Sequence, residues 1–291
     1  MTKLKTIIIA GGSGFLGKQL TNVCKKKYKV ISVGYRTNQK YKFDLCKKNL
    51  FLKFCKKVRP DLIINCAALT NVEKCETNKA LAYKTNVTVV KNIVEICRFL
   101  SCKFIHISTD QMYDSIKKFN TEDRQKIYNF YTKTKVTSEK IAKKYKKSTI
   151  YRTNFFGSIN NKQGNINWIF ESIKKKRKIY LINDVFFSPL YINTLVKIIY
   201  KNLFKNSYGI YNLGSSIGMS KEEFFKKIIK RISLKCEFQS VSFNELLKIY
   251  KNMCPRPKKM DMNVSKFEKT FNFKLPTLKK EITKFCNDYK N

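Results

Sequence analysis

The sequence of 291 residues predicts an α/β protein built on a doubly wound parallel sheet, followed by a smaller C-terminal lobe. In the first half, short apolar runs alternate with amphipathic runs, which is the order that produces a parallel sheet. Runs such as Ile7–Ala10 and Leu62–Asn65 are continuously apolar, as expected for strands covered on both faces. After about Asn154 the pattern becomes less regular, which indicates the second lobe.

Each element of the first half follows from one of these runs. Strands are predicted at Thr6–Ala10, Tyr28–Val33, Leu62–Asn65, Lys103–Ile107 and Thr149–Arg152. Helices are predicted at Phe15–Lys27, Leu50–Val58, Ala80–Phe99 and Tyr131–Lys144. Pro60 ends the second of these helices.

The second half has fewer clear signals. Ile166–Ser172 and Ile192–Leu203 are apolar runs, and Ser220 followed by Glu223 predicts a capped helix start. A last helix follows Pro276. We therefore place a first domain at 1–155 and a second at 156–291, with a segment near 183–204 returning to the first.

A glycine-rich turn follows the first strand directly. The segment Thr6–Gly17 reads TIIIAGGSGFLG, in which Gly11, Gly14 and Gly17 separate an apolar run from an amphipathic one. Glycines permit a tight turn, and the free N–H groups of the helix that follows favour a pyrophosphate. The GxxGxxG spacing is close to the GxGxxG dinucleotide fingerprint, so the segment predicts a Rossmann-type cofactor-binding domain.

Composition narrows the class of protein. No apolar run approaches the roughly 20 residues of a membrane helix, and no signal-peptide cleavage pattern is present, so we expect a cytoplasmic protein without a membrane span. The ten cysteines include no CxxC pair, which indicates reduced thiols rather than a zinc site. The net charge of +41 would favour nucleic acid or anionic ligands. However, the chain is rich in residues with codons of A and T alone, and we favour this compositional bias and expect no specific nucleic acid.

A tyrosine and a lysine form the candidate catalytic pair. Tyr131 and Lys135 are four residues apart, so a helix places both on one face. An ammonium beside a phenol makes the phenol a better acid and base at neutral pH. About twenty residues earlier, Ser108, Thr109 and Asp110 end a strand, where ligands of parallel sheets gather.

In this order the motifs resemble the extended short-chain dehydrogenase/reductases, and more narrowly the dTDP-4-dehydrorhamnose reductase family. The matching segments run through nearly the whole chain. They are GGSGFLG (11–17), DLIINCAALTNVEKCE (61–76), AYKTNV (82–87), HISTDQMYD (106–114), YTKTKVTSE (131–139), YRTNFFG (151–157), NDVFFSPLYINTL (183–195) and RPKKMDMNVSKFEKTFNFKLP (256–276).

The resemblance implies a set of cofactor-binding residues. These are Gly11, Ser13, Gly14, Phe15, Leu16, Gly17, Arg36, Asp44, Leu45, Ala67, Ala68, Asn86 and Lys135. Arg36 stands where an acidic residue would bind the ribose of NADH, so NADPH is expected, with NADH as the alternative. Asp44 and Leu45 would lie near the adenine, and Asn86 would support the site from its helix.

The resemblance also assigns the chemistry. Thr109 would orient the substrate carbonyl, Tyr131 would donate the proton, and Lys135 would lower the Tyr131 pKa. The implied substrate-binding residues are Thr70, Gln111, Phe155 and Arg256. The expected reaction is reduction of a 4-keto-6-deoxy nucleotide sugar for surface polysaccharide assembly. A homodimer is the expected assembly, and the resemblance assigns no metal ligand, which leaves open whether the reaction needs a metal.

The chain departs from the family pattern at two positions, and other interpretations stay open. Thr132 replaces the family's glycine, and Gln111 replaces an aromatic residue. Because glutamine cannot act as a base, Gln111 argues against a sugar dehydratase and leaves Asp110 a structural role. Glu139 has either a metal-site or a helix-packing role, and His106 is expected in the core. Alternative functions are another nucleotide-sugar reductase or epimerase, a catalytically silent NADP-binding regulatory subunit, or an RNA-binding protein.

Overall fold

A computed structural model describes residues 4–35, 41–115, 119–157 and 166–290. The chain divides into two units. The first comprises Met1–Thr109, Asn129–Arg152 and Val196–Tyr211, and the second comprises Asp110–Tyr128, Thr153–Leu195 and Asn212–Asn291. The second unit includes 110–128, and the segment 196–211 belongs to the first unit.

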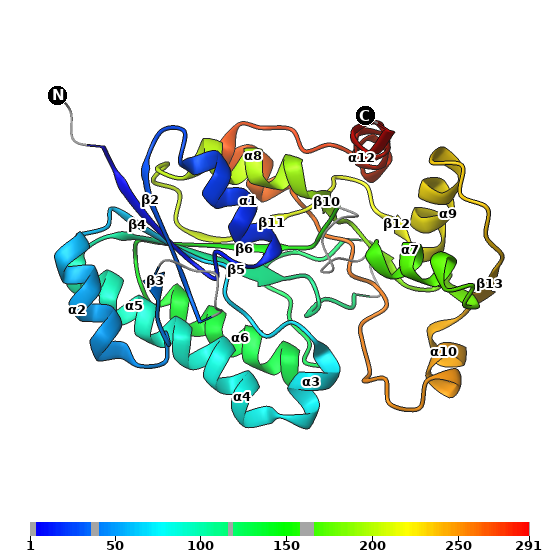
Figure 1. The fold of residues 1–291 in the computed structure, drawn as a ribbon, viewed down its shortest axis with the longest axis horizontal. Helices are drawn as coiled ribbons and strands as arrows, with labels where there is room; N and C mark the ends of the chain where they lie inside the picture. The colour runs from blue at the N-terminus through cyan, green and yellow to red at the C-terminus, as the bar shows by residue number, and fades with distance from the viewer. Residues whose placement is uncertain (1–3, 36–40, 116–118, 158–165, 291) are drawn as a thin grey trace. The chain divides into compact units, whose positions relative to one another are not determined.

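A seven-stranded sheet forms the centre of the first unit (Figure 1). The strand order is β11-β6-β5-β4-β1-β2-β3. The bounds are β1 (Thr6–Ala10), β2 (Lys29–Gly34), β3 (Tyr41–Lys42), β4 (Leu62–Asn65), β5 (Lys103–Thr109), β6 (Ser148–Thr153) and β11 (Gly209–Leu213). The pairings from β3 through β5 are parallel. The strand order runs outward in opposite directions from β1 and β4, and doubly wound sheets bind ligands at the carboxyl ends of such a strand pair.

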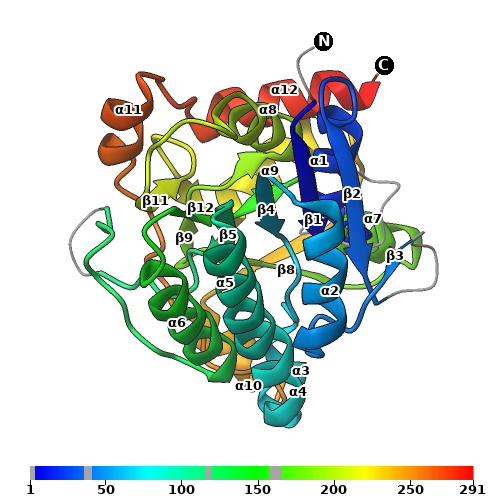
Figure 2. The ribbon, with the colours of Figure 1, turned by 90° about the vertical axis from the view of Figure 1, so that its left-hand side faces the viewer.

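Helices cover both faces of this sheet. Helices α1 (Phe15–Cys24) and α8 (Ile192–Asn202) lie on one face, and α2 (Lys48–Val58), α5 (Val89–Leu100) and α6 (Phe130–Lys143) lie side by side on the other (Figures 1 and 2). The buried residues between them include Ile8, Phe51, Ile93 and Phe104. The predicted doubly wound α/β fold is confirmed.

The segment predicted as a single helix over Ala80–Phe99 is interrupted. It comprises α4 (Lys79–Tyr83), a π-helical turn at Lys84–Thr88, and α5. A short helix, α3 (Val72–Thr77), precedes it. Since π-turns in helices are often found at functional sites, the turn draws attention to Asn86 within it.

The second unit contains small sheets and five helices in the part of the chain that is described. The strand pairs are β7 (Phe155–Phe156) with β10 (Leu190–Tyr191), β8 (Ile179–Ile182) with β13 (Phe238–Val241), and β9 (Phe186–Phe187) with β12 (Met219–Ser220). The helices are α7 (Asn167–Lys174), α9 (Lys221–Arg231), α10 (Phe243–Ile249), α11 (Ser265–Phe271) and α12 (Leu278–Lys290). The predicted cap is present, because Ser220 Oγ accepts a bond from Glu223 N.

Aromatic rings fill the core of the second unit. Phe224 packs edge-on against Phe156 and Phe187, with ring centroids 4.9 and 5.2 Å apart, and Phe156 also contacts Phe285. None of the helices within the described ranges has the length and apolar character needed to cross a bilayer.

Candidate functional site

The turn between β1 and α1 has no room for a side chain at Gly11 or Gly17. Gly11 has a φ of 79°, and a Cβ added there would lie 2.6 Å from the backbone nitrogen of Ala67. A Cβ on Gly17 would lie 2.3 Å from the carbonyl oxygen of Gly11. No side chain caps the start of α1 at Gly14, and no acidic residue stands in its first turn. The N–H groups of this ten-residue helix therefore suit a phosphate group, and the cradle fits the predicted dinucleotide.

The loop that follows β4 is held by Asn86. Its Oδ1 accepts from Leu69 N at 2.7 Å, and its Nδ2 donates to Leu69 O at 3.1 Å and to Thr134 Oγ1 at 3.0 Å. The Asn86 amide therefore joins this loop to α6. Ala67 and Ala68 are half-buried in this loop, and Thr70 is exposed.

Helix α6 begins with a capping box. Asn129 Oδ1 accepts from Thr132 N at 2.9 Å, and Thr132 Oγ1 accepts from Asn129 N at 3.1 Å. Thr132 is completely buried. The residue that departs from the family pattern thus fixes the start of the helix that carries Tyr131.

Lys135 reaches the end of β5 from α6. Tyr131 and Lys135 are both buried, at 6% and 2% exposure, one helical turn apart. Lys135 Nζ donates to Ile107 O at 2.8 Å, two residues before the buried Thr109. The structure therefore brings the predicted lysine against the strand that ends in Thr109. Burial lowers the pKa of Lys135 to about 8, and the negative charge of Glu139 opposes this change.

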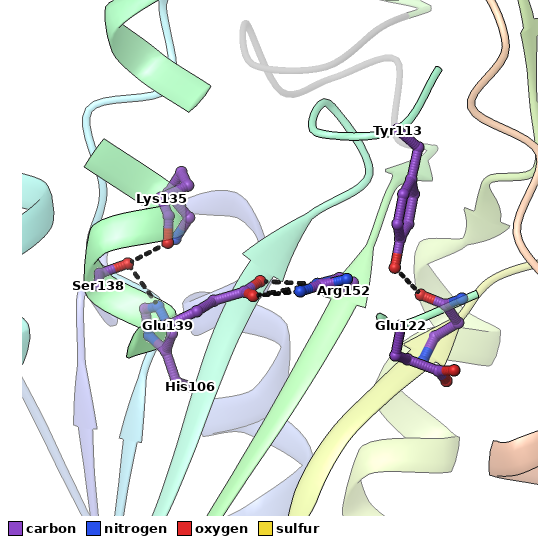
Figure 3. Close-up of polar contacts among 8 residues, drawn as sticks. His106, Tyr113, Glu122, Lys135, Ser138, Glu139 and Arg152 are labelled. Atoms are coloured by element: carbon purple, nitrogen blue, oxygen red, sulfur yellow. Dashed lines mark hydrogen bonds and ion pairs between the residues drawn. The ribbon is translucent and has the colours of Figure 1, made fainter. Parts of the chain in front are cut away.

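Glu139 forms a buried ion pair rather than an open carboxylate. Arg152 Nε lies 3.0 and 3.1 Å from its two oxygens, and the distance from a terminal guanidinium nitrogen to Oε2 is 2.7 Å (Figure 3). Arg152 is fully buried and Glu139 is 1% exposed. Of the two predicted roles, the geometry supports packing of α6 against β6.

His106 lies in the core, as expected, with both ring nitrogens engaged. Nδ1 is 3.2 Å from Asn65 Nδ2, and Nε2 is 3.2 Å from Ser138 Oγ (Figure 3). The exposed fraction of His106 is zero. Burial and the charge of Lys135 lower the pKa of His106 well below its usual range.

The other predicted cofactor residues differ in burial and in their contacts. Arg36 lies outside the described residues. Leu45 is in the hydrophobic core, and Asp44 accepts a bond from Cys46 N at 3.0 Å. The side chains of Phe15 and Leu16 are buried, whereas Ser13 is half-buried in the turn.

The predicted substrate residues lie in the second unit, except for Thr70. Asp110 is buried and accepts a bond from Asn154 Nδ2 at 2.8 Å, which fits the structural role expected for it. Gln111 and Phe155 are half-buried. Lys221, which the sequence analysis did not identify, is the first residue of α9. The charges of Arg256 and Asp110 both affect the pKa of Lys221. Burial, together with the charge of Arg256, lowers the pKa of Lys221 to about 8, and the charge of Asp110 opposes this change.

The fold and these side chains define a Rossmann-like α/β protein with a tyrosine–lysine pair on α6. The profile of the RmlD substrate binding domain family matches residues 5–291, so the chain belongs to this family. It is 28% identical to the spore coat polysaccharide biosynthesis protein SpsK of Bacillus subtilis, over 88% of this chain and 87% of that protein. It is 24% identical to the dTDP-4-dehydrorhamnose reductase of Aggregatibacter actinomycetemcomitans, over 85% and 89%.

Solved structures agree with the family assignment. The dTDP-4-dehydrorhamnose reductase of Bacillus anthracis, in complex with NADP, matches with a TM-score of 0.89 at 24% identity, over 98% of this chain and 100% of that one. A hypothetical dTDP-4-dehydrorhamnose reductase from Sulfolobus tokodaii matches with a TM-score of 0.83 at 28% identity, over 94% and 97%. The family resemblance predicted from the motifs is confirmed.

Proposed function

We propose that this protein uses NADPH to reduce the 4-keto group of a 4-keto-6-deoxy nucleotide sugar. Several relatives carry the name dTDP-4-dehydrorhamnose reductase, which describes this reaction. The observation that carries the proposal is the placement of Lys135, whose Nζ contacts Ile107 O while Tyr131 lies on the same helical face. This is the arrangement that a carbonyl reductase needs beside Thr109.

Thr109, Tyr131 and Lys135 would each have a different role in the reduction. Thr109 Oγ1 would donate a hydrogen bond to the sugar carbonyl, which stabilises the negative charge that develops on its oxygen. Tyr131 would transfer its phenolic proton to that oxygen, leaving a phenolate that the Lys135 ammonium stabilises. When bound, NADPH supplies the hydride for the carbonyl carbon. The hydride and the proton together convert the ketone to a secondary alcohol.

The first unit supplies the cofactor-binding residues. Gly11, Gly14 and Gly17 let the pyrophosphate approach the N-terminus of α1, and Ala67 and Ala68 leave space beside it. β2 ends at Gly34 and Tyr35 follows, so no carboxylate stands there to repel a 2′-phosphate. The NADP complex of the Bacillus anthracis reductase supports NADPH as the cofactor.

The second unit supplies charge for the nucleotide. The charges of two basic side chains, Lys221 and Arg256, act on one another, and the carboxylate of Asp110 also acts on Lys221. The diphosphate of a nucleotide sugar has the opposite charge. We propose that Lys221 and Arg256 bind it. Changing Lys221 to Met should raise KM for the nucleotide sugar about tenfold and leave kcat within twofold, whereas Lys230→Met, exposed on the same helix, should change neither.

The proposal includes a cytoplasmic location and a homodimer. All ten cysteines are free thiols, which is the state expected in a reducing compartment. Fractionation of cells that express a tagged chain, and light scattering of the purified protein, test these two points.

Turnover tests the proposed reaction. We expect NADPH consumption with a dTDP- or UDP-linked 4-keto-6-deoxy sugar, and a loss of about 10²–10⁴-fold in kcat for Tyr131→Phe. The matched control is Tyr83→Phe, the same change at an exposed tyrosine, which should leave kcat unchanged. If the wild type binds NADPH tightly but reduces none of these sugars, the chain is a binding or regulatory subunit.

A further inference from the structure

A chain of hydrogen bonds runs through the first unit behind Lys135. Ala67 N donates to Asn65 Oδ1 at 3.2 Å, and Asn65 Nδ2 lies 3.2 Å from His106 Nδ1. His106 Nε2 lies 3.2 Å from Ser138 Oγ, which donates to Lys135 O at 2.8 Å. The chain thus joins the loop after β4, the strand β5 and the helix α6.

The direction of every bond in this chain is fixed. Ser138 Oγ has one hydrogen, which it donates to Lys135 O, so it must accept from His106 Nε2. His106 therefore carries its proton on Nε2, and Nδ1 accepts from the Asn65 amide. Asn65, His106 and Ser138 each accept one hydrogen bond and donate another, between the Ala67 N–H and the Lys135 carbonyl. An imidazolium would have two donors and no acceptor, so only neutral His106 completes the chain.

The surroundings of His106 preserve this neutral form. Asn65 and His106 are register partners on β4 and β5, so their side chains lie together. The charged or titratable groups around Lys135 are Cys66 after β4, Glu139 on α6 and, paired with it, Arg152 on β6. Burial raises the pKa of Cys66 to about 12, so this neighbour stays a neutral thiol. Glu139 is paired with Arg152, and the positive charge of Lys135 disfavours a second proton on the imidazole.

Two consecutive residues of β5 fix the position of Lys135. His106 binds Ser138, whose hydroxyl holds the Lys135 carbonyl, and Ile107 O accepts from Lys135 Nζ. The backbone and the side chain of Lys135 are therefore held at the same place on the strand. At the other end, Ala67 stands beside Gly11 in the predicted cofactor cradle.

We propose that His106 is a positioning residue of the reductase, a neutral imidazole that couples the cofactor loop at Ala67 to Lys135 through Asn65 and Ser138. This inference rests on the proposed function. The hydrogen-bond chain keeps α6 in the register that places Lys135 and Tyr131 at the end of β5. Without it, both the cofactor loop and the lysine lose a fixed partner.

The tautomer gives a test that does not depend on activity. His106 is the only histidine of the chain, so ¹⁵N-histidine labelling gives the signals of a single imidazole. We expect a protonated Nε2 and an unprotonated Nδ1, unchanged when the pH falls below about 6.5, where a free imidazole becomes charged. A protonated Nδ1 at neutral pH, or titration near that value, would overturn the proposal.

Matched serine variants test the positioning role. Ser138→Ala removes the acceptor of His106, and we expect kcat to fall about fivefold, with KM for the sugar unchanged. Ser148→Ala is the control, because Ser148 Oγ is also buried but has no hydrogen-bond partner among the described residues. His106→Phe keeps a planar ring and should lower kcat at least as much as Ser138→Ala.

The outcomes separate this inference from the proposed function. If the wild type is active and Ser138→Ala has the kcat of Ser148→Ala, His106 has only a structural role and the inference is wrong. If the wild type is inactive, the proposed function fails, and NADPH affinity then tests the coupling at Ala67. In that case Ser138→Ala should weaken NADPH binding relative to Ser148→Ala, and equal affinities would reject the inference.

Discussion

Replacing Arg152 with Met should destabilise the protein more than most single substitutions do. Arg152 is fully buried, Glu139 is 1% exposed, and three N–O contacts of 2.7–3.1 Å join them. Removing the guanidinium leaves a buried carboxylate without its counter-charge, which costs about 3–5 kcal/mol of unfolding free energy. An exposed ion pair would contribute only about 0–1 kcal/mol, so burial decides the magnitude.

Urea unfolding followed by circular dichroism measures this cost. The double variant Glu139→Leu with Arg152→Met removes both charges at similar volume, and its unfolding free energy should return to within about 1–2 kcal/mol of the wild type. Arg98→Met, at an exposed position of α5, is the control and should cost less than about 0.5 kcal/mol. A cost below about 1 kcal/mol for Arg152→Met, or equal costs for the single and double variants, would refute this reasoning.

Three further predictions concern the cofactor cradle and the catalytic helix. Gly11→Ala should weaken NADPH binding at least tenfold by calorimetry, because the new Cβ meets the Ala67 backbone; unchanged affinity would show that this turn does not bind the cofactor. Asn86→Ala removes three hydrogen bonds to Leu69 and Thr134, so we expect a loss of about 1–3 kcal/mol in unfolding free energy together with lower kcat; full activity would mean that the loop needs no such support. Because the pKa of Lys135 is lowered to about 8, its ammonium form is lost as the pH rises through that value, and kcat should fall above about pH 8; a flat profile to about pH 10 would contradict this role.

Much of the first unit could be predicted from the sequence, because its strands are buried on both faces. Thr6–Ala10 and Leu62–Asn65 were predicted to the residue, since each apolar run ends at polar or glycine positions. The glycine turn and the Tyr131–Lys135 pair follow from local spacing in the same way. Local sequence patterns were sufficient to predict those features whose geometry depends only on residues of the same segment.

Long-range contacts account for what could not be predicted. The π-turn at Lys84–Thr88 interrupts the apolar periodicity only slightly, and the partners of Asn86 are distant in the sequence. The segment 110–128 groups with the second unit through bonds such as that from Tyr113 OH to Asn212 Oδ1, 99 residues away. Lys221 is half-buried, and nothing in the sequence distinguished it from the many exposed lysines.

Hydride transfer to the sugar tests the central claim most directly. The wild type would be incubated with the 4-keto-6-deoxy nucleotide sugar and NADPH that carries deuterium on the transferred position of its nicotinamide, and the product analysed by mass spectrometry. We expect a deuterium on the carbon of the former ketone, and at least a hundredfold slower labelling with Tyr131→Phe. An unlabelled sugar beside tightly bound NADPH, or equal labelling by both proteins, would contradict the account.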